Sequence, residues 1–319
     1  MSASENDLLP TRPRIAIIGS GAMGCYYGAR MAQHGHDMKF LMRADLAHVG
    51  EHGLVIKSCA GDFTLPDVQA FATTAGMGPC DLIFIALKTT ANADLAQLLP
   101  PLLHPGTVIV TLQNGLGNEA HLASLHRADQ VLGGVCFVCI NRTAPGVIDH
   151  ISDGDVALGE FASGPRPRTE QISALLNACL IPSRVEASLG VVRWKKLVWN
   201  IPFNGLAITG GGITTAAILA DPELAAATRI LADEAVAAAA VLGHPLPGGW
   251  ADYQISRTPA MGPYRPSSMI EFVENRPVEV EAIWGEPVRQ ALAAGANVPR
   301  MEQLYQEIQE AVAGRSMPT

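Results

Sequence analysis

The sequence predicts an α/β fold with a mostly parallel sheet in its N-terminal part, followed by an all-α C-terminal domain. In the first half, apolar runs of strand length alternate with segments of helical character, as in parallel α/β sheets. Residues 189–319 are rich in Ala and almost free of strand-like runs. A chain of 319 residues is also longer than one ordinary hydrophobic core can accommodate. We therefore predict two domains, residues 13–185 and residues 186–319.

Composition narrows the possible partners. The formal net charge of −8 argues against nucleic acid, because phosphate binding needs clustered Lys and Arg. No uninterrupted apolar run has the length that spans a bilayer, so no membrane partner is expected. Residues 1–10 carry acids and lack the apolar core of a signal peptide. We expect a cytoplasmic protein, either a monomer or a homodimer.

The cysteines and histidines predict no metal site. Cys136 and Cys139 have CxxC spacing, but they stand in an apolar strand-like run. An offset of three residues points side chains to opposite faces of a strand. We interpret both as small buried apolar residues, and the histidines form no HExxH motif.

The first predicted strand, residues 14–18, runs directly into a GxGxxG motif, and a helix is expected from there to about residue 34. In this context Gly19 permits the tight turn, Gly21 lets the backbone approach a pyrophosphate, and Gly24 lets helix and strand pack closely. The helix N-terminus supplies N–H groups and a positive dipole end for phosphates. The motif predicts a Rossmann-type dinucleotide-binding domain.

The second strand, residues 37–42, is followed by Arg43. A site for NAD usually has an acid at this strand end, which binds the ribose 2′-hydroxyl. A guanidinium there instead suits a 2′-phosphate, so we predict NADP(H) as the cofactor. The alternative is that Arg43 is an ordinary surface residue and that Asp45, in the following loop, contacts the ribose.

Two further strands, residues 81–87 and 107–112, end in polar residues at the same predicted edge of the sheet. Lys88 follows the first of them and can bind cofactor phosphate or ribose, or be a solvated lysine. Asn114 follows the second and can contact nicotinamide, ribose or substrate. Its alternative role is turn formation, which Asn-Gly favours by itself.

The remaining elements follow from local patterns. Extended segments are expected over 54–56, 62–65, 131–140, 146–151 and 155–160, and helices over 91–99, 168–180 and 222–242. Residues 181–185 are predicted to be a connecting segment. Asp221 and Pro222 are typical of a helix start, and Gly243 of its end.

An apolar stretch, residues 191–204, carries the polar residues Lys196, Asn200 and Asn204 at intervals of four. On a helix this spacing places them along one face. Buried amides need partners, and no carboxylate stands at four-residue spacing to pair the lysine. We interpret the row as the wall of a polar cleft; the alternative is a solvated face.

Two acidic or hydroxyl-bearing segments complete the candidate residues. Ser267 and Ser268 precede a helix, where hydroxyls and free N–H groups can bind a substrate carboxylate or where they can cap the helix. Glu279 stands among apolar residues and is either a functional acid or an exposed helix residue.

Taken together, these segments resemble the ketopantoate reductase (2-dehydropantoate 2-reductase) family from the first strand nearly to the C-terminus. The resemblance rests on Gly19 to Gly24, Arg43, Lys88, residues 113–117, residues 194–200, Asn204, residues 267–269 and residues 276–279. It implies a Rossmann domain, a helical C-terminal domain, an active site in the cleft between them, and NADPH as hydride donor.

The resemblance also implies roles for individual residues. Lys196 matches the catalytic lysine and Glu279 the acid that contacts substrate. The substrate-binding residues that it implies are Asn114, Asn200, Asn204 and Ser268. The cofactor-binding residues that motif and resemblance indicate are Gly19, Ser20, Gly21, Ala22, Met23, Gly24, Arg43, Lys88 and Asn114. The interval from Ser268 to Glu279 is one residue shorter than the common pattern, so the choice between Ser267 and Ser268 stays open. Pro202 removes a helical bond to Val198 and can shift Asn204 relative to Lys196.

The implied reaction is NADPH-dependent reduction of ketopantoate to pantoate, a step toward pantothenate and CoA, with Lys196 as general acid. One alternative is a related NADP-dependent dehydrogenase for another small 2-keto or 2-hydroxy acid. The other is a non-catalytic NADP-sensing protein, which would not need Lys196, Asn200 and Glu279.

Overall fold

A computed structural model describes residues 8–315, and the chain divides into two compact units. The first, which we call the sheet unit, consists of Met1–Gln113 and Asn118–Leu189. The second, the helical unit, consists of Gly190–Thr319 together with the short segment Asn114–Gly117. Residues 1–7, which belong to the N-terminal segment that lacks the pattern of a signal peptide, lie outside the described residues.

The sheet unit contains a mostly parallel sheet in the order β4-β3-β9-β8-β7-β6-β1-β2-β5, with β10 paired to β9. Only the pairs β3·β4 and β8·β9 are antiparallel among the described strands. The strands are β1 (Arg14–Ile18), β2 (Asp37–Leu41), β3 (Leu54–Ser58), β4 (Phe63–Leu65), β5 (Gln69–Phe71), β6 (Leu82–Ile85), β7 (Val108–Thr111), β8 (Val131–Ala144), β9 (Val147–Glu160) and β10 (Ser183–Val185).

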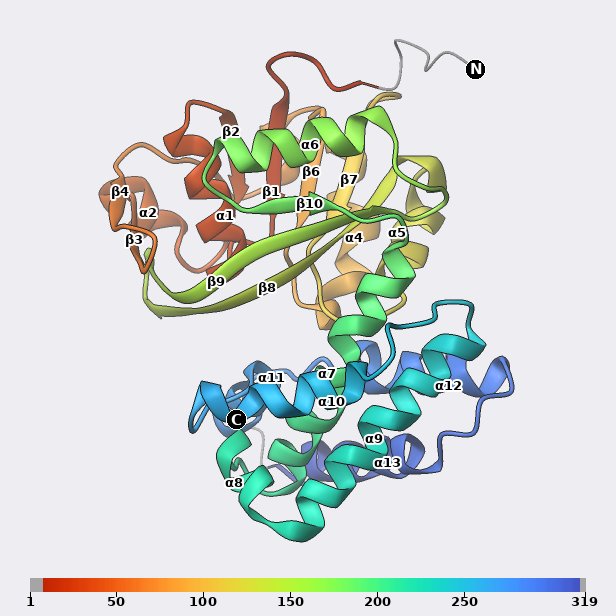
Figure 1. Ribbon diagram of the computed structural model, residues 1–319. Helices are drawn as coiled ribbons and strands as arrows, with labels where there is room; N and C mark the ends of the chain where they lie inside the picture. Colours follow the sequence, from red (N-terminus) through yellow and green to blue (C-terminus); the bar gives the residue numbers. More distant parts are fainter. Residues whose placement is uncertain (1–7, 316–319) are drawn as a thin grey trace. The chain divides into compact units, whose positions relative to one another are not determined.

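Alternation along the central strands builds a core on each face of this sheet. Ile15 and Ile17 of β1 pack in a cluster with residues of α1 (Ala22–Gln33) and α6 (Pro167–Ala178), which Figure 1 shows on one side of the strands. Ala16 and Ile18 belong to a second cluster, with residues of α4 (Leu95–Leu98) and α5 (Asn118–Leu125). Helices on both faces of a mostly parallel sheet are the Rossmann-type arrangement that the sequence predicted.

Several boundaries differ from the sequence prediction. Strands β8 and β9 are continuous and longer than predicted, and they form a hairpin whose turn contains Gly146 at φ +66°. Both β5 and β10 were missed, and the segment 181–185 is therefore partly a strand. The predicted helix over 91–99 is a 3₁₀ segment, η2 (Thr89–Asp94), followed by α4. Cys136 is buried as predicted, but Cys139 is only half-buried.

The short elements of the sheet unit connect these strands. They are α2 (Leu46–His52), α3 (Thr74–Met77), η3 (Pro100–Leu102) and η4 (Ala128–Gln130).

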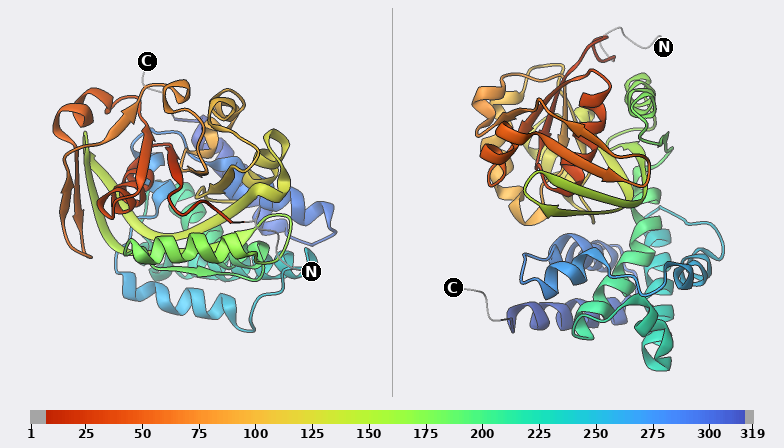
Figure 2. Two further views of the ribbon diagram at one scale, coloured as in Figure 1. Left: turned by 90° about the horizontal axis from the view of Figure 1, so that it is seen from above. Right: turned by 90° about the vertical axis from the view of Figure 1, so that its left-hand side faces the viewer.

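All described elements of the helical unit are helices, as predicted, and two views of them are given in Figure 2. They are α7 (Leu189–Thr209), α8 (Thr215–Ala220), α9 (Pro222–Val241), α10 (Trp250–Arg257), η5 (Thr258–Met261), α11 (Ser267–Val273), the π-helix η6 (Glu281–Gly285), α12 (Glu286–Ala293) and α13 (Pro299–Ala313). Asp221 caps α9 by accepting hydrogen bonds from the N–H groups of Glu223 and Leu224. No helix among residues 8–315 is both long and apolar enough to cross a membrane.

Helix α7 supplies much of the core of this unit. Trp194, Ile201 and Phe203 are each at most 1% exposed. The helix continues through Pro202 to Thr209, so the proline does not end it.

Candidate active site

The glycine-rich turn after β1 is shaped by close backbone packing. Gly19 has φ +105°, and a Cβ there would lie 2.3 Å from the backbone nitrogen of Leu87. A Cβ on Gly24 would lie 2.2 Å from the carbonyl oxygen of Gly19. Both positions therefore require glycine for the turn and for helix–strand packing, which are the roles that the motif predicts.

Gly21 is different, because a Cβ added there would meet nothing within 4 Å. It is the N-cap of α1 and carries no side-chain cap, so the N–H groups of Ala22, Met23 and Gly24 begin the helix without one. Ser20 is anchored by its hydroxyl, which donates to the carbonyl of Leu41 at 2.8 Å. An open approach to an uncapped helix N-terminus fits the phosphates of a dinucleotide.

The end of β2 presents Arg43 with its side chain 70% exposed. Its Nη2 lies 3.0 Å from Oδ2 of Asp94. Asp45, the alternative ribose contact, is 12% exposed and accepts hydrogen bonds from Arg142 at 3.0 Å and from the N–H of Gly146 at 3.3 Å. Arg43 is thus the accessible charged side chain of this pair.

The other two sheet-edge positions fall in different units. Lys88 is exposed and is the N-cap residue of η2. Asn114 belongs to the helical unit, although its neighbour Gln113 belongs to the sheet unit. The side chain of Asn92 accepts from Gln113 Nε2 at 2.7 Å and donates to Asn118 Oδ1 at 3.0 Å, so it holds both residues that flank the segment 114–117.

In the helical unit, the ammonium of Lys196 donates to Oδ1 of Asn114 at 2.8 Å. The adjacent Lys195 diverges from it, with its Nζ 5.4 Å from the ring centroid of Trp250. The structure therefore joins two candidate residues that are 82 positions apart in the sequence.

The amides of α7 are buried, so the alternative of a solvated face is wrong for them. Asn200 is 8% exposed and Asn204 is 2% exposed. Oδ1 of Asn204 accepts the backbone N–H of Ser268 at 3.0 Å, which ties α7 to the first turn of α11. This contact was not predicted.

The two serines of α11 differ in burial. Ser268 is 1% exposed, whereas Ser267 is exposed. The N-cap of α11 is Pro266, and no side chain caps this helix, so the capping alternative for the serines is wrong. Burial favours Ser268 as the residue that the resemblance indicates.

Glu279 is 3% exposed, so the alternative of an exposed helix acid is also wrong. It lies just before the π-helix η6, and its carbonyl accepts the N–H of Ile283 at 3.2 Å. A buried carboxylate is unusual unless it is paired or functional.

The π-helix is the part of this site that sequence reasoning missed. The N–H of Leu116 donates to the carbonyl of Ala282 at 2.9 Å. Gly115 has φ +81°, and a Cβ there would lie 2.1 Å from the same oxygen. The Asn-Gly pair indicated a turn, but nothing in the sequence pattern indicated what the turn packs against.

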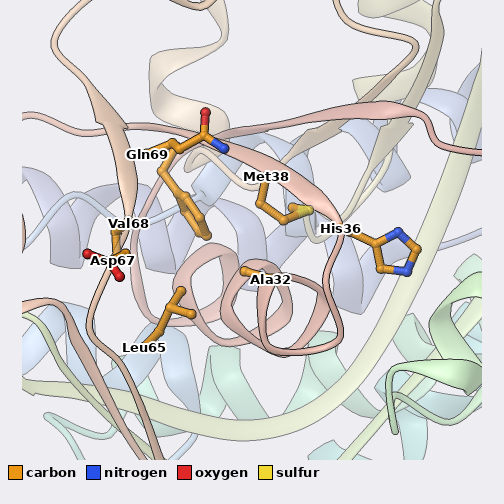
Figure 3. A pocket seen from close by; sticks show the side chains of 8 residues that line it. Ala32, His36, Met38, Leu65, Asp67, Val68 and Gln69 are labelled. Atoms are coloured by element: carbon orange, nitrogen blue, oxygen red, sulfur yellow. The ribbon is translucent and has the colours of Figure 1, made fainter.

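Neither a metal site nor a second candidate site is found among the described residues. No three His, Cys, Asp or Glu side chains of residues 8–315 come together in a group that could hold a metal ion. A pocket of about 120 Å³ in the sheet unit is lined by His36, Asp67 and Gln69 among other residues, and Figure 3 shows them around it. It contains none of the candidate site residues.

Comparisons with known proteins identify the family. The family model described as ketopantoate reductase PanE/ApbA matches residues 15–163, and the model of its C-terminal part matches residues 190–312. A curated 2-dehydropantoate 2-reductase of Nostoc sp. is 39% identical over 300 residues, which cover 92% of this chain and 94% of the relative. The chain belongs to the ketopantoate reductase family. It is accordingly an oxidoreductase, and the alternative of a non-catalytic sensor is set aside.

Solved structures of ketopantoate reductases agree with this assignment. The 2-dehydropantoate 2-reductase of Geobacter metallireducens is 40% identical, with a TM-score of 0.91 over 93% of this chain and 99% of that one. The fold is also shared by a D-mandelate dehydrogenase solved with NADH and anilino(oxo)acetate, at 20% identity and a TM-score of 0.86, covering 94% of this chain and 98% of that one. Reductases of this family use a nicotinamide dinucleotide.

Proposed function

We propose that the protein reduces 2-dehydropantoate to pantoate with NADPH, as a cytoplasmic enzyme of pantothenate and CoA biosynthesis. The observation that carries this proposal is the hydrogen bond between Lys196 and Asn114. It holds an ammonium in a fixed direction, on a helix whose neighbouring polar residues are buried amides.

Lys196 is the proposed general acid. When bound, the nicotinamide supplies hydride to the 2-keto carbon, and negative charge then develops on the carbonyl oxygen. An ammonium near that oxygen stabilises the charge and delivers the proton. Asn114 keeps the ammonium in one orientation, and such positioning is a large part of the rate gain in reactions of two bound reactants.

The remaining residues of the helical unit are proposed to bind the substrate. The bond from the N–H of Ser268 fixes the amide of Asn204, and the buried Ser268 is placed at a helix start that favours a carboxylate. Asn200 and Glu279 would bind the polar groups of the substrate, with Glu279 at its hydroxyl. Each of these side chains is at most 8% exposed, so each contact would be made away from bulk water.

NADPH is proposed as the cofactor because of Arg43. The turn from Gly19 to Gly24 would hold the pyrophosphate, Arg43 the 2′-phosphate, and Lys88 a phosphate or the ribose. The exposed guanidinium and the engagement of Asp45 with Arg142 both support a 2′-phosphate site. The D-mandelate dehydrogenase of the same fold was solved with NADH, so the fold by itself does not select between the two cofactors.

A substrate panel tests the proposal. Oxidation of NADPH would be followed by absorbance with ketopantoate, with a 2-keto acid of the same carbon skeleton that lacks the hydroxyl, and with an aromatic 2-keto acid. We expect kcat/KM to be at least tenfold higher for ketopantoate. A preference for the aromatic acid would instead identify a dehydrogenase for another 2-keto acid, and no turnover with any of them would refute the proposal.

A further inference from the structure

We propose that the π-helix η6 sets the position of Asn114 against Lys196, and that Trp284 is the positioning residue that anchors it to α7. This inference rests on the proposed function, in which Lys196 is the general acid. All the contacts that carry it lie within the helical unit.

The first contact is made by the carbonyl of Ala282, which does not accept the N–H group that it would accept in an α-helix. In an α-helix the carbonyl of Ala282 would accept the N–H of Glu286. Here the N–H of Glu286 bonds to the carbonyl of Glu281, one residue earlier. The next possible donor in a π-helix is residue 287, which is Pro287 and has no N–H.

The released carbonyl of Ala282 holds the segment that carries Asn114. It accepts the N–H of Leu116 at 2.9 Å. The chain passes so close to Ala282 that a Cβ on Gly115 would overlap this oxygen at 2.1 Å. Asn114 is the next residue, so its side chain starts from a backbone that the π-helix fixes.

The second contact joins the π-helix to α7. The indole of Trp284 is 1% exposed, and its Nε1 donates to the carbonyl of Ile201 at 3.0 Å. Gly205 leaves room for it, because a Cβ there would lie 3.0 Å from the same Nε1. Lys196 stands on α7 five positions before Ile201. One short helix therefore contacts both the segment of Asn114 and the helix of Lys196.

Trp250 offers a matched control. Its Nε1 donates to the carbonyl of Lys195 at 3.0 Å, so it makes the same kind of bond to the same helix. It belongs to α10, however, and not to the π-helix. Trp284→Phe and Trp250→Phe each remove one indole N–H and retain an aromatic ring.

The experiment measures two quantities in the full-length protein: kcat with NADPH and the best substrate of the panel, and the hydrogen-exchange rate of the Leu116 amide. We expect Trp284→Phe to lower kcat about tenfold, to leave NADPH affinity unchanged, and to speed exchange at Leu116. Trp250→Phe should change kcat by less than twofold and leave Leu116 exchange unchanged. Equal effects of the two variants on kcat would overturn the proposal.

A double substitution separates positioning from a general loss of structure. If Trp284 acts through Asn114, Trp284→Phe should lower kcat no further in the Asn114→Ala protein. Multiplication of the two losses would refute the coupling. Lys196→Ala in the same assay tests the proposed function separately, because an undiminished kcat in this variant would reject Lys196 as the acid. The exchange rate of the Leu116 amide would still report on its hydrogen bond to Ala282.

A second variant covers the case in which Trp284→Phe does not fold. Pro287→Ala introduces a backbone N–H that can compete with the N–H of Leu116 for the carbonyl of Ala282. It removes no side-chain hydrogen bond. It should speed Leu116 exchange and lower kcat. Unchanged values of both would also overturn the proposal.

Discussion

Oδ1 of Asn114 lies 2.8 Å from the ammonium nitrogen of Lys196, so a helix residue donates a hydrogen bond to a turn residue. An amide oxygen accepts from a protonated lysine but offers no negative charge. This contact orients the ammonium without neutralising it, which is what a general acid requires.

The first prediction concerns the two adjacent lysines. Lys196→Ala should lower kcat by about 10² or more, the usual contribution of a positioned acid. Lys195→Ala should be nearly silent, because Lys195 lies over the ring of Trp250 and not at Asn114. Steady-state kinetics of both variants would decide, and a larger loss in Lys195→Ala would mean that the roles are reversed.

The second prediction concerns cofactor choice. NADPH should bind at least about tenfold more tightly than NADH, a difference of about 1.4 kcal/mol, and Arg43→Ala should remove most of it. The binding constants can be measured by fluorescence titration. Equal affinities of the wild-type protein for both cofactors would show that the guanidinium of Arg43 does not bind the 2′-phosphate.

Asp94 provides a complementary variant. Its carboxylate lies 3.0 Å from Arg43 and would compete with the cofactor phosphate for the same guanidinium. Asp94→Asn should therefore raise the affinity for NADPH and leave that for NADH unchanged. A parallel change for both cofactors would contradict this account.

The third prediction concerns Glu279. If its carboxylate binds the substrate hydroxyl, Glu279→Gln should lower kcat/KM with ketopantoate and leave NADPH affinity unchanged. With a 2-keto acid that lacks the hydroxyl, wild type and variant should differ little, because the two changes remove one interaction. Equal losses with both acids would mean that Glu279 acts on Lys196 or on another step.

The fourth prediction concerns pH and the stability of the sheet unit. Burial opposes ionisation of Asp81, but hydrogen bonds from Arg14, together with one from His104, outweigh it and hold the pKa of Asp81 below its ordinary value. A carboxyl whose pKa is lowered on folding stabilises the protein above its unfolded pKa of about 3.9, and this stabilisation is lost as the pH falls through the folded pKa.

Asp81→Asn should accordingly lower the free energy of unfolding by about 1 kcal/mol at pH 7. The difference from wild type should shrink as the pH falls below about 4. Urea denaturation at a series of pH values would measure it. A difference that is constant with pH would assign the effect to packing and not to charge.

Sequence reasoning was most successful where one local pattern determines the structure. The turn after β1 needs glycine at two positions for steric reasons, and those reasons can be read from the motif. It was least successful for pairing partners. Strand β10 has three residues, follows Pro182, and exists because it pairs with β9. No local signal reports such a partner.

The candidate site shows the same division. The spacing of Lys196, Asn200 and Asn204 predicted a common helix, and α7 contains all three. The acceptor for Lys196 is Asn114, and the donor to Asn204 is the N–H of Ser268. Both lie on other segments of the chain, and no local sequence pattern predicts such contacts. The π-helix differs from an α-helix because the N–H of Glu286 bonds to Glu281 and not to Ala282. The spacing of apolar residues does not predict this shift.

The segment Asn114–Gly117 packs with the helical unit although both its neighbours in the chain pack with the sheet unit. During synthesis it emerges long before the carbonyl of Ala282 that will hold it. Strands β1, β6 and β7 can pair by then, because domains fold as units from the N-terminus. A nascent chain would thus acquire the glycine-rich turn after β1 first. The backbone contact that fixes Asn114 beside Lys196 would form only when residue 282 has left the ribosome.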